Sequence, residues 1–409
     1  MSDPDKLTVF VEAVRASGLL EPEECNALSR AAERPGADAE GLARDLIERA
    51  LLTAYQARKL YRGQGADLFL NQYILLDKLG EGGMGEVFKA KHTRLDRDVA
   101  LKVIRRERLA NPDTVRRFRR EIRAAAALAH ENVVLAYDAD QSGDVHFFAM
   151  EYVDGTTLDR YVREKGPLPI GEACDYIRQV AFGLQHAHER GLIHRDIKPS
   201  NLLLSTTGVV KVSDLGLVLV DDPDAESASR ITKDGLTVGT PDYVAPEQAR
   251  NPRGADIRAD IYSLGGTFYF LLTGAVPYPG GTPTEKMLKH AREPFPTAIR
   301  ADLPPAVAAV LQKMTAKKPD DRYSTPGDVA AALNAFVPLK PVPVPPPPPA
   351  SISGVDLLAD EPAPTRRETA TDSRFRLPET TADPVPRARK TGCLPAVLLI
   401  GFLFAVTLR

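Results

Sequence analysis

The stretch that decides the fold is HRDIKPSN, His194 to Asn201. It places Asp196 two residues before Lys198 and five residues before Asn201. An acid, a cation and an amide side chain held this close together could handle a proton, neutralise developing negative charge and bind a metal ion. Which of these roles apply depends on the other motifs of the chain.

A glycine-rich segment, LGEGGMGEVFKA from Leu79 to Ala90, has Gly80, Gly82 and Gly85 in a G-x-G-x-x-G-x-V pattern. Glycines let the backbone turn sharply and approach phosphate oxygens closely. The alternative is a glycine-rich hairpin that binds no ligand. A dinucleotide-binding fold would run from the glycines into a helix, whereas EVFKAKH and RDVALKVI alternate like the strands of a hairpin. The segment is therefore predicted to cover a ligand from a β-ribbon.

Lys102 lies on the second of these strands, where a lysine is usually solvated. About twenty residues later, TVRRFRREIRAAAALAH is predicted to form a helix with Glu121 beside its apolar stripe. Glu121 could hold the Lys102 ammonium against the phosphates of a nucleotide. The alternative is a surface ion pair between Glu121 and Arg117 or Arg120.

Asp214, in SDLGLV, would be an ordinary turn residue by itself. Together with Asn201 it forms a candidate magnesium site, because Mg²⁺ prefers oxygen ligands and keeps phosphates and waters in its other positions. Asp196 would then accept or orient a proton from an attacking hydroxyl, and Lys198 would neutralise charge on the transferring group. The combined set predicts phosphoryl transfer.

Composition divides the 409 residues into four parts. Residues 1–66 have apolar side chains at helical spacing and a capping box in TAYQ (Thr53 to Gln56), which predicts a small helical module with a core of its own. Residues 73–336 alternate strand and helix patterns and are predicted to form one globular domain. Residues 337–390 are rich in proline and poor in aromatic residues, which predicts a disordered linker. Residues 391–409 are mostly apolar.

The overall charge and the cysteines exclude several classes. A formal net charge of −2 gives no basic field for nucleic acid. The three cysteines are far apart and lack C-x-x-C spacing, so neither a disulfide framework nor a zinc site is expected, and a reducing cytoplasm fits best. The first residues lack the basic leader and apolar core of a signal peptide.

The motifs resemble, in order and spacing, those of eukaryotic-like protein kinases, and they are most similar to bacterial serine/threonine kinases. The resemblance covers about Tyr73 to Phe336. It implies an α+β, bilobal fold with a β-rich N-lobe and a helical C-lobe. It also implies ATP and Mg²⁺, or Mn²⁺ in its place, as cofactors. Composition, and not the resemblance, predicts the helical module before this domain and the linker and a C-terminal transmembrane helix after it.

The resemblance also assigns roles to individual residues. Asp196 and Lys198 match the catalytic positions, and Asn201 and Asp214 match the metal ligands, although D-L-G stands where the family often has D-F-G. Met150 would be the gatekeeper beside adenine. The ATP-binding positions would be Leu79, Gly80, Glu81, Gly82, Gly83, Met84, Gly85, Glu86, Val87, Ala100, Lys102, Glu121, Glu151, Val153 and Leu203.

GTPDYVAPEQ, Gly239 to Gln248, resembles the end of a kinase activation segment. The resemblance implies an ion pair between Glu247 and Arg322, and a buried Asp260 that braces the catalytic loop. Lys198 and Thr240 are similar to the residues of serine/threonine-specific kinases, so serine or threonine is the expected acceptor.

Regulation by phosphorylation is a further expectation from the resemblance. Arg195 is expected to pair with a phosphorylated residue of the activation loop. Thr232 is the first candidate and Thr237 the second; the alternative is that these hydroxyls only solvate a loop.

Two other functions fit the motifs less well than an active protein kinase. A pseudokinase scaffold commonly lacks the lysine or one of the aspartates, whereas Lys102, Asp196 and Asp214 are all present. A small-molecule kinase fits less well, because the segment from Asp214 to Glu247 resembles a peptide-docking region. Expected partners are protein substrates and a second copy of the chain for trans-autophosphorylation, and not nucleic acid.

The uncharged run from Cys393 to Leu408 predicts a membrane anchor. As a helix it would span about 24 Å, somewhat short of the ~30 Å hydrocarbon core. RARK, Arg387 to Lys390, precedes it and should remain cytoplasmic, which predicts a single-pass protein of the cell membrane with a cytoplasmic kinase domain. The alternative is a buried terminal helix.

Overall fold

The computed structural model describes residues 3–83, 85–106, 115–116, 120, 122–123, 125–215, 241–251, 255–296 and 300–338. Predictions that concern Met84, Glu121, the activation loop from 216 to 240 and the chain beyond 338 therefore lie outside the described residues. Among the residues described, no helix combines the length and the apolar character needed to cross a bilayer.

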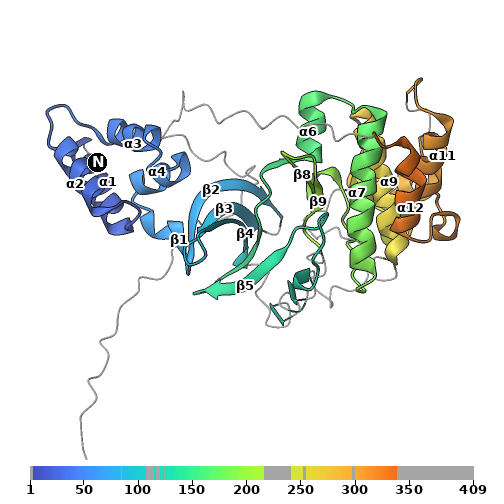
Figure 1. The fold of residues 1–409 in the computed structure, drawn as a ribbon, viewed down its shortest axis with the longest axis horizontal. Helices are drawn as coiled ribbons and strands as arrows, with labels where there is room; N and C mark the ends of the chain where they lie inside the picture. The colour runs from blue at the N-terminus through green and yellow to red at the C-terminus, as the bar shows by residue number, and fades with distance from the viewer. Residues whose placement is uncertain are drawn as a thin grey trace, which may run out of the picture.

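The N-lobe is built on a six-stranded antiparallel sheet with the order β1-β2-β3-β4-β6-β5 (Figure 1). The hairpin predicted from EVFKAKH and RDVALKVI is confirmed as β3 and β4, with Val87 opposite Lys102. The strands are β1 (Phe69–Leu70), β2 (Tyr73–Gly82), β3 (Gly85–His92), β4 (Arg97–Ile104), β5 (Ala136–Ser142) and β6 (Val145–Glu151).

The C-lobe is mainly helical and packs around α9 (Ile257–Thr273), which is buried on most of its circumference. Asp256 caps the start of α9 by accepting a hydrogen bond from Arg258 N, and Gly274 ends it in a left-handed conformation at φ 70°. The other helices are α6 (Leu158–Lys165), α7 (Ile170–His188), α8 (Pro246–Arg250), α10 (Pro283–Arg292), α11 (Pro305–Met314) and α12 (Pro326–Leu333).

Short elements complete the C-lobe next to the N-lobe. A three-stranded sheet has the order β7-β8-β9, with β7 at Gly155–Thr157, β8 at Leu202–Ser205 and β9 at Val210–Val212. In the part of the chain that the structure describes, the 3-10 turns of the C-lobe are η3 (Pro199–Asn201), η5 (Pro241–Tyr243), η6 (Pro319–Asp321) and η7 (Asn334–Phe336), whereas η1 (Gly65–Leu68) precedes the N-lobe. Together the two lobes form the predicted bilobal α+β arrangement.

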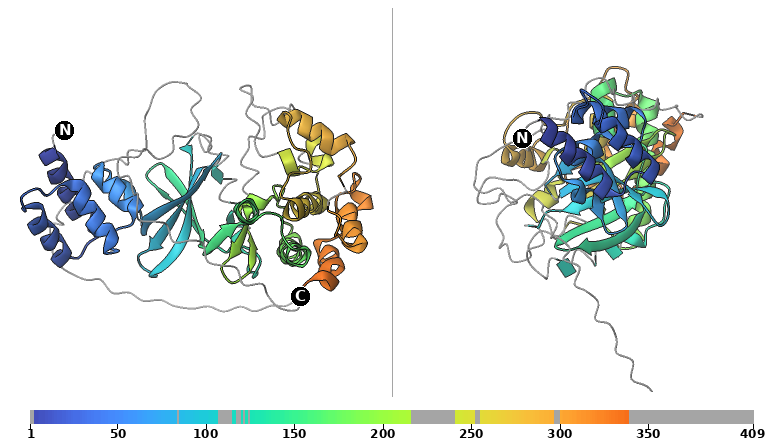
Figure 2. Two further views of the ribbon diagram at one scale, coloured as in Figure 1. Left: turned by 90° about the horizontal axis from the view of Figure 1, so that it is seen from above. Right: turned by 90° about the vertical axis from the view of Figure 1, so that its left-hand side faces the viewer.

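Four N-terminal helices precede the N-lobe: α1 (Asp3–Ser17), α2 (Pro22–Ala32), α3 (Ala39–Glu48) and α4 (Ala54–Tyr61). The capping box predicted at Thr53 and Gln56 is present at the start of α4. Both views place these helices beside the sheet, on the side away from the C-lobe (Figures 1 and 2).

The N-terminal helices do not close on a core of their own. Their buried residues Phe10 and Leu60 belong to the same hydrophobic cluster as Phe88 and Leu101 of the sheet. The apolar stripes of the sequence predicted that one face of each helix is buried, but a stripe does not identify the surface that covers it. The helices and the N-lobe therefore share one core.

Candidate active site

The loop between α7 and β8 brings together the residues of the opening motif. Lys198 Nζ lies 2.8 Å from Asp196 Oδ2. Asn201 Nδ2 donates to the Asp196 backbone oxygen at 2.8 Å and to Asp196 Oδ2 at 3.1 Å. Pro199 starts the η3 turn that carries Asn201 back towards the aspartate. The predicted acid, cation and amide thus form one connected group.

Asp260 on α9 is fully buried and binds the backbone of the loop that carries Asp196. Its carboxylate accepts the backbone N–H of His194 at 2.9 Å and that of Arg195 at 2.7 Å. Arg195 has a φ of 67°, a left-handed conformation that is uncommon for a non-glycine residue. The two bonds from Asp260 fix this unusual turn of the backbone immediately before Asp196.

Two supporting residues were not identified from the sequence. His188 Nε2, at the end of α7, lies 2.8 Å from Asp260 Oδ2. Gln248 Nε2 on α8 donates to the Arg195 carbonyl at 3.0 Å. No sequence motif predicts the role of His188. Gln248 could have been suspected from its position next to Glu247 in GTPDYVAPEQ.

Lys102 reaches across from β4 to the metal-binding candidate of the C-lobe. Its Nζ lies 2.7 Å from Asp214 Oδ1, and the Lys102 residue is 6% exposed. Burial alone would raise the pKa of Asp214, but the adjacent Lys102 charge and hydrogen bond hold it below its ordinary value. The predicted partner of Lys102, Glu121, lies outside the described residues.

The glycine-rich segment is the turn between β2 and β3, where Gly82 pairs with Gly85. Gly85 has a φ of 158°, and a Cβ there would lie 1.8 Å from the Val103 carbonyl oxygen, so packing within the sheet requires glycine. Around Gly80 and Gly82, by contrast, a Cβ would meet no atom within 4 Å among the described residues. Packing does not explain these two glycines, which agrees with a backbone left open for a ligand.

Charged residues flank this turn. Lys78 Nζ lies 3.0 Å from Glu81 Oε2 and 2.6 Å from Glu86 Oε1. Arg105 also pairs with Glu81. The hydrogen bond from Lys78 is the largest of the effects that lower the pKa of Glu81. These pairs hold both sides of the turn together.

The predicted adenine-binding residues come from both lobes. Ala100 of β4 pairs with Met150 of β6, and each is 7% exposed. Leu203 comes from β8 in the C-lobe, whereas Leu79, on β2, is 47% exposed. The N–H of Glu151 donates to the Leu135 oxygen at 2.8 Å. A bond from Glu151 to adenine would therefore use its carbonyl oxygen, with the next contact expected at the half-buried Val153.

The ion pair expected between Glu247 and Arg322 is present. Arg322 Nη1 and Nη2 lie 2.6 Å and 2.8 Å from the two carboxylate oxygens of Glu247. Arg322 also donates to the carbonyl oxygens of Arg258 and Ala316, and it is 4% exposed. This paired arginine anchors the end of the activation segment to the C-lobe. Thr232, Thr237 and Thr240 lie outside the described residues.

The donors around Asp214 and Asn201 fit a magnesium ion carried by a nucleotide. Asn201 uses its Nδ2 to hold Asp196, which leaves its carbonyl oxygen as the atom for a metal. Among the residues that the structure describes, no cluster of three or more His, Cys, Asp or Glu side chains could hold a metal by itself. Mg²⁺ is usually held by one or two protein oxygens together with substrate phosphates, so this sparse donor set suits it.

Comparison with known proteins supports the resemblance to protein kinases that the sequence motifs indicated. The family model described as the protein kinase domain matches residues 73–334. Serine/threonine-protein kinase PknB of Mycobacterium tuberculosis is 40% identical over 269 residues, 64% of this chain and 42% of that protein. Serine/threonine-protein kinase PrkC of Bacillus subtilis is 38% identical over 262 residues, 64% of this chain and 40% of that protein. The alignments thus span less than half the length of these relatives.

A solved structure extends the agreement to the fold. The kinase domain of Mycobacterium tuberculosis PknI superposes with a TM-score of 0.52 at 29% sequence identity, covering 66% of this chain and 96% of that domain. The matched family model covers well over half of the chain, and the relatives are bacterial serine/threonine kinases. The chain therefore belongs to the protein kinase family, among the bacterial eukaryotic-like serine/threonine kinases.

Proposed function

We propose that this protein transfers the γ-phosphate of ATP to serine or threonine hydroxyls of proteins. The observation that carries the proposal is the grouping of Asp196 with Lys198 and Asn201, at distances of 2.8 to 3.1 Å. Asp214, whose Oδ1 lies 2.7 Å from Lys102 Nζ, would supply a second oxygen donor. Phosphoryl transfer needs this combination of base, cation and metal ligands.

Each side chain has a separate task in the proposed reaction. Asp196 orients the acceptor hydroxyl and takes its proton, while Lys198 stabilises negative charge on the phosphoryl group. Lys102 contacts the α- and β-phosphates, and Asn201 and Asp214 hold the metal. Mg²⁺, or Mn²⁺, bound there would offset the charge of the phosphate oxygens. The backbone of Gly80 and Gly82 approaches the phosphates from above.

Serine and threonine are the proposed acceptors because Lys198 and Thr240 resemble the forms found in kinases with that specificity. The alternative, a pseudokinase scaffold, is disfavoured by the presence of Lys102, Asp196 and Asp214, which such scaffolds commonly lack. Protein substrates are the proposed partners, and the net charge of −2 does not favour nucleic acid.

The test is transfer of labelled γ-phosphate to a generic protein rich in serine and threonine, with Mg²⁺ present. Wild-type protein should label the acceptor, and acid hydrolysis should release phosphoserine and phosphothreonine. Asp196→Asn should slow the labelling by at least about a hundredfold. An absence of transfer by wild-type protein would reject the kinase assignment, and phosphotyrosine as the main product would reject the acceptor class.

We further propose control by phosphorylation of Thr232, or secondarily Thr237, by a second copy of the chain. Within the described residues, Arg195 Nε is buried and has no hydrogen-bond partner. A phosphothreonine could supply charge-assisted acceptors to this guanidinium. Phosphate mapping on active protein tests the proposal, and a fully active enzyme with an unmodified loop would refute it.

We also propose that residues 391–409 anchor the chain in the cell membrane, with residues 337–390 as a tether and the kinase domain in the cytoplasm. The uncharged run from Cys393 to Leu408 and the preceding RARK support this arrangement. Full-length protein should resist carbonate extraction from membranes, whereas a chain ending at Lys390 should not. Full-length protein found wholly in the soluble fraction would exclude the anchor.

A further inference from the structure

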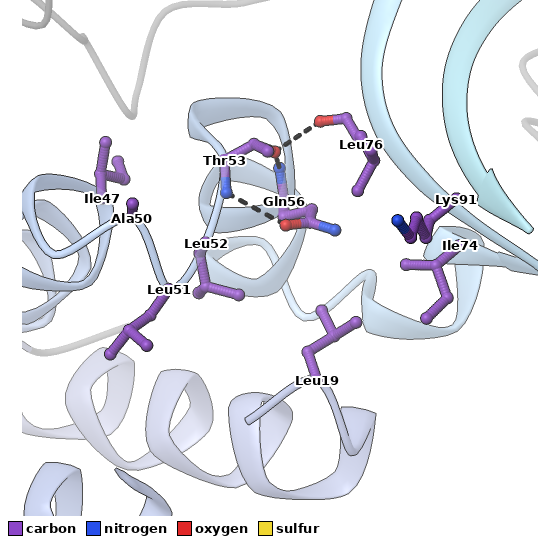
Figure 3. A pocket seen from close by; sticks show the side chains of 10 residues that line it. All are labelled: Leu19, Ile47, Ala50, Leu51, Leu52, Thr53, Gln56, Ile74, Leu76 and Lys91. Atoms are coloured by element: carbon purple, nitrogen blue, oxygen red, sulfur yellow. Dashed lines mark hydrogen bonds between the residues drawn. The ribbon is translucent and has the colours of Figure 1, made fainter. Parts of the chain in front are cut away.

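Helix α4 lies along β2 and is bonded to two of its backbone carbonyls. Gln56 Nε2 donates to the Leu75 oxygen at 3.0 Å, and Thr53 Oγ1 donates to the Leu76 oxygen. Figure 3 shows Thr53 and Gln56 on the first turn of α4, facing Leu76. In addition, the Tyr55 ring packs against Phe88 of β3 with the ring centroids 5.8 Å apart. The first turn of α4 is therefore fixed to the sheet by three contacts, from Thr53, Tyr55 and Gln56.

These contacts meet β2 where its pairing is irregular. β1 pairs only with Tyr73 and Ile74, so among the described residues no strand pairs with β2 on that side from Leu75 onwards. The register of β2 with β3 skips Leu76, which is a bulge. Bulge residues interrupt the ladder of hydrogen bonds and bend the strand. Helix α4 thus provides a bonding partner at the bulge.

The first glycine of the glycine-rich turn, Gly80, follows the bulge at Leu76 by four residues. Leu75 and Leu76 lead through a second irregularity, between Lys78 and Gly80, into the turn that ends at Gly85. From Leu75 onwards the only described strand that pairs with β2 is β3, and each of its two bulges interrupts that ladder, which leaves this part of the strand easier to displace. Fixing Leu75 and Leu76 from α4 therefore limits the movement of the glycine-rich turn that follows.

Gln56 does more than its position in the capping box requires. Its Oε1 accepts the Thr53 N–H at 3.0 Å, which closes the box, and glutamate would serve equally well for that bond. Its Nε2 is the atom that bonds to Leu75, and only an amide can donate there. Gln56 is 4% exposed, so the Leu75 carbonyl would be left without a donor at a buried site if this bond were lost.

We propose that α4 positions the glycine-rich turn for ATP, with Gln56 and Thr53 as the positioning residues. This inference rests on the proposed function, because it concerns nucleotide binding by the kinase. It makes the N-terminal helices part of the catalytic unit: a change on α4 alters the affinity for ATP without touching the nucleotide.

The sharpest test is Gln56→Glu in the full-length chain. Glutamate retains the capping box but presents an acceptor to the Leu75 carbonyl, so the helix cap remains while the bond to the strand is lost. We expect the KM for ATP to rise about three- to tenfold, the range for one lost buried hydrogen bond. We expect kcat to change less than about twofold, because the catalytic loop lies in the other lobe. Gln312→Glu, the same change at an exposed site on α11, should leave both constants unchanged.

A second pair of variants keeps the test valid if Gln56→Glu folds poorly. Thr53→Val, which removes the hydroxyl, should raise the KM for ATP. Thr53→Ser, which retains the hydroxyl, should keep the wild-type KM. Unchanged KM values in both Gln56→Glu and Thr53→Val, with an active wild type, would overturn the inference, even if the melting temperature fell. Absence of phosphate transfer by wild-type protein would instead overturn the proposed function.

Discussion

The carboxylate of Asp260 offers a quantitative test of how the catalytic loop is held. Asp260→Asn keeps the shape of the side chain but leaves one acceptor oxygen where there were two. The amide can therefore satisfy the N–H of His194 or that of Arg195, which now lie 2.9 Å and 2.7 Å from the carboxylate, but not both. One charge-assisted bond is lost and one buried N–H is left unpaired, which together should cost about 3 to 5 kcal/mol. Because Asp196 follows directly, a shift of the loop should also lower kcat by roughly a hundredfold.

Urea unfolding followed by circular dichroism, together with steady-state kinetics, measures both effects. Asp256→Asn is the matched control: it is the same substitution on the same helix, but at the exposed N-cap, where asparagine caps about as well. The control should lose less than about 1 kcal/mol and keep its activity. If Asp260→Asn were as stable and as active as Asp256→Asn, the bracing role of Asp260 would be refuted.

The remaining predictions test other parts of the structure. Lys102→Met should lower phosphate transfer by roughly a hundredfold or more, because it removes a preorganised charge at the phosphates, and wild-type rates would contradict the role. Glu247→Gln should lower the free energy of unfolding by about 3 kcal/mol, because it removes the negative charge that neutralises the buried Arg322 guanidinium, whereas Glu40→Gln at an exposed pair should cost below about 0.5 kcal/mol in the same urea titration. Burial lowers the pKa of His290 from 6.5 to about 4, so the unfolded chain binds a proton that the folded chain does not. The free energy of unfolding should therefore fall by about 3 kcal/mol as the pH decreases from 6.5 to 4. His290→Gln should not show this contribution to the pH dependence of the free energy of unfolding.

Local features of the fold could be predicted from the sequence where a short pattern determines the structure. The alternation in RDVALKVI predicted β4, and TAYQ predicted the capped start of α4. The packing of α1 to α4 on the sheet could not be predicted, because an apolar stripe shows that a face is buried and not what covers it. The shared core of Phe10 and Phe88 depends on contacts between residues distant in the sequence.

In the candidate site, too, the local arrangement could be predicted from the sequence and the contacts between distant residues could not. The chain segment from Asp196 to Asn201 is short, so its spacing alone places the three side chains within reach of one another. The pair of Lys102 and Asp214 joins residues 112 positions apart, and the contact of His188 with Asp260 spans 72 positions. Such contacts depend on the packing of α7 against α9 and on the approach of the two lobes. Short sequence patterns do not predict either of these.

The most direct test of the central claim, that Asp196 serves a phosphoryl transfer reaction, separates nucleotide binding from chemistry. Asp196→Asn and wild-type protein are compared by calorimetric titration with Mg²⁺ and ATP and by single-turnover transfer to a protein acceptor. The account predicts that the two proteins bind nucleotide with equal affinity, and that the variant transfers phosphate about 10² to 10⁴-fold more slowly. Equal transfer rates for the two proteins would contradict it.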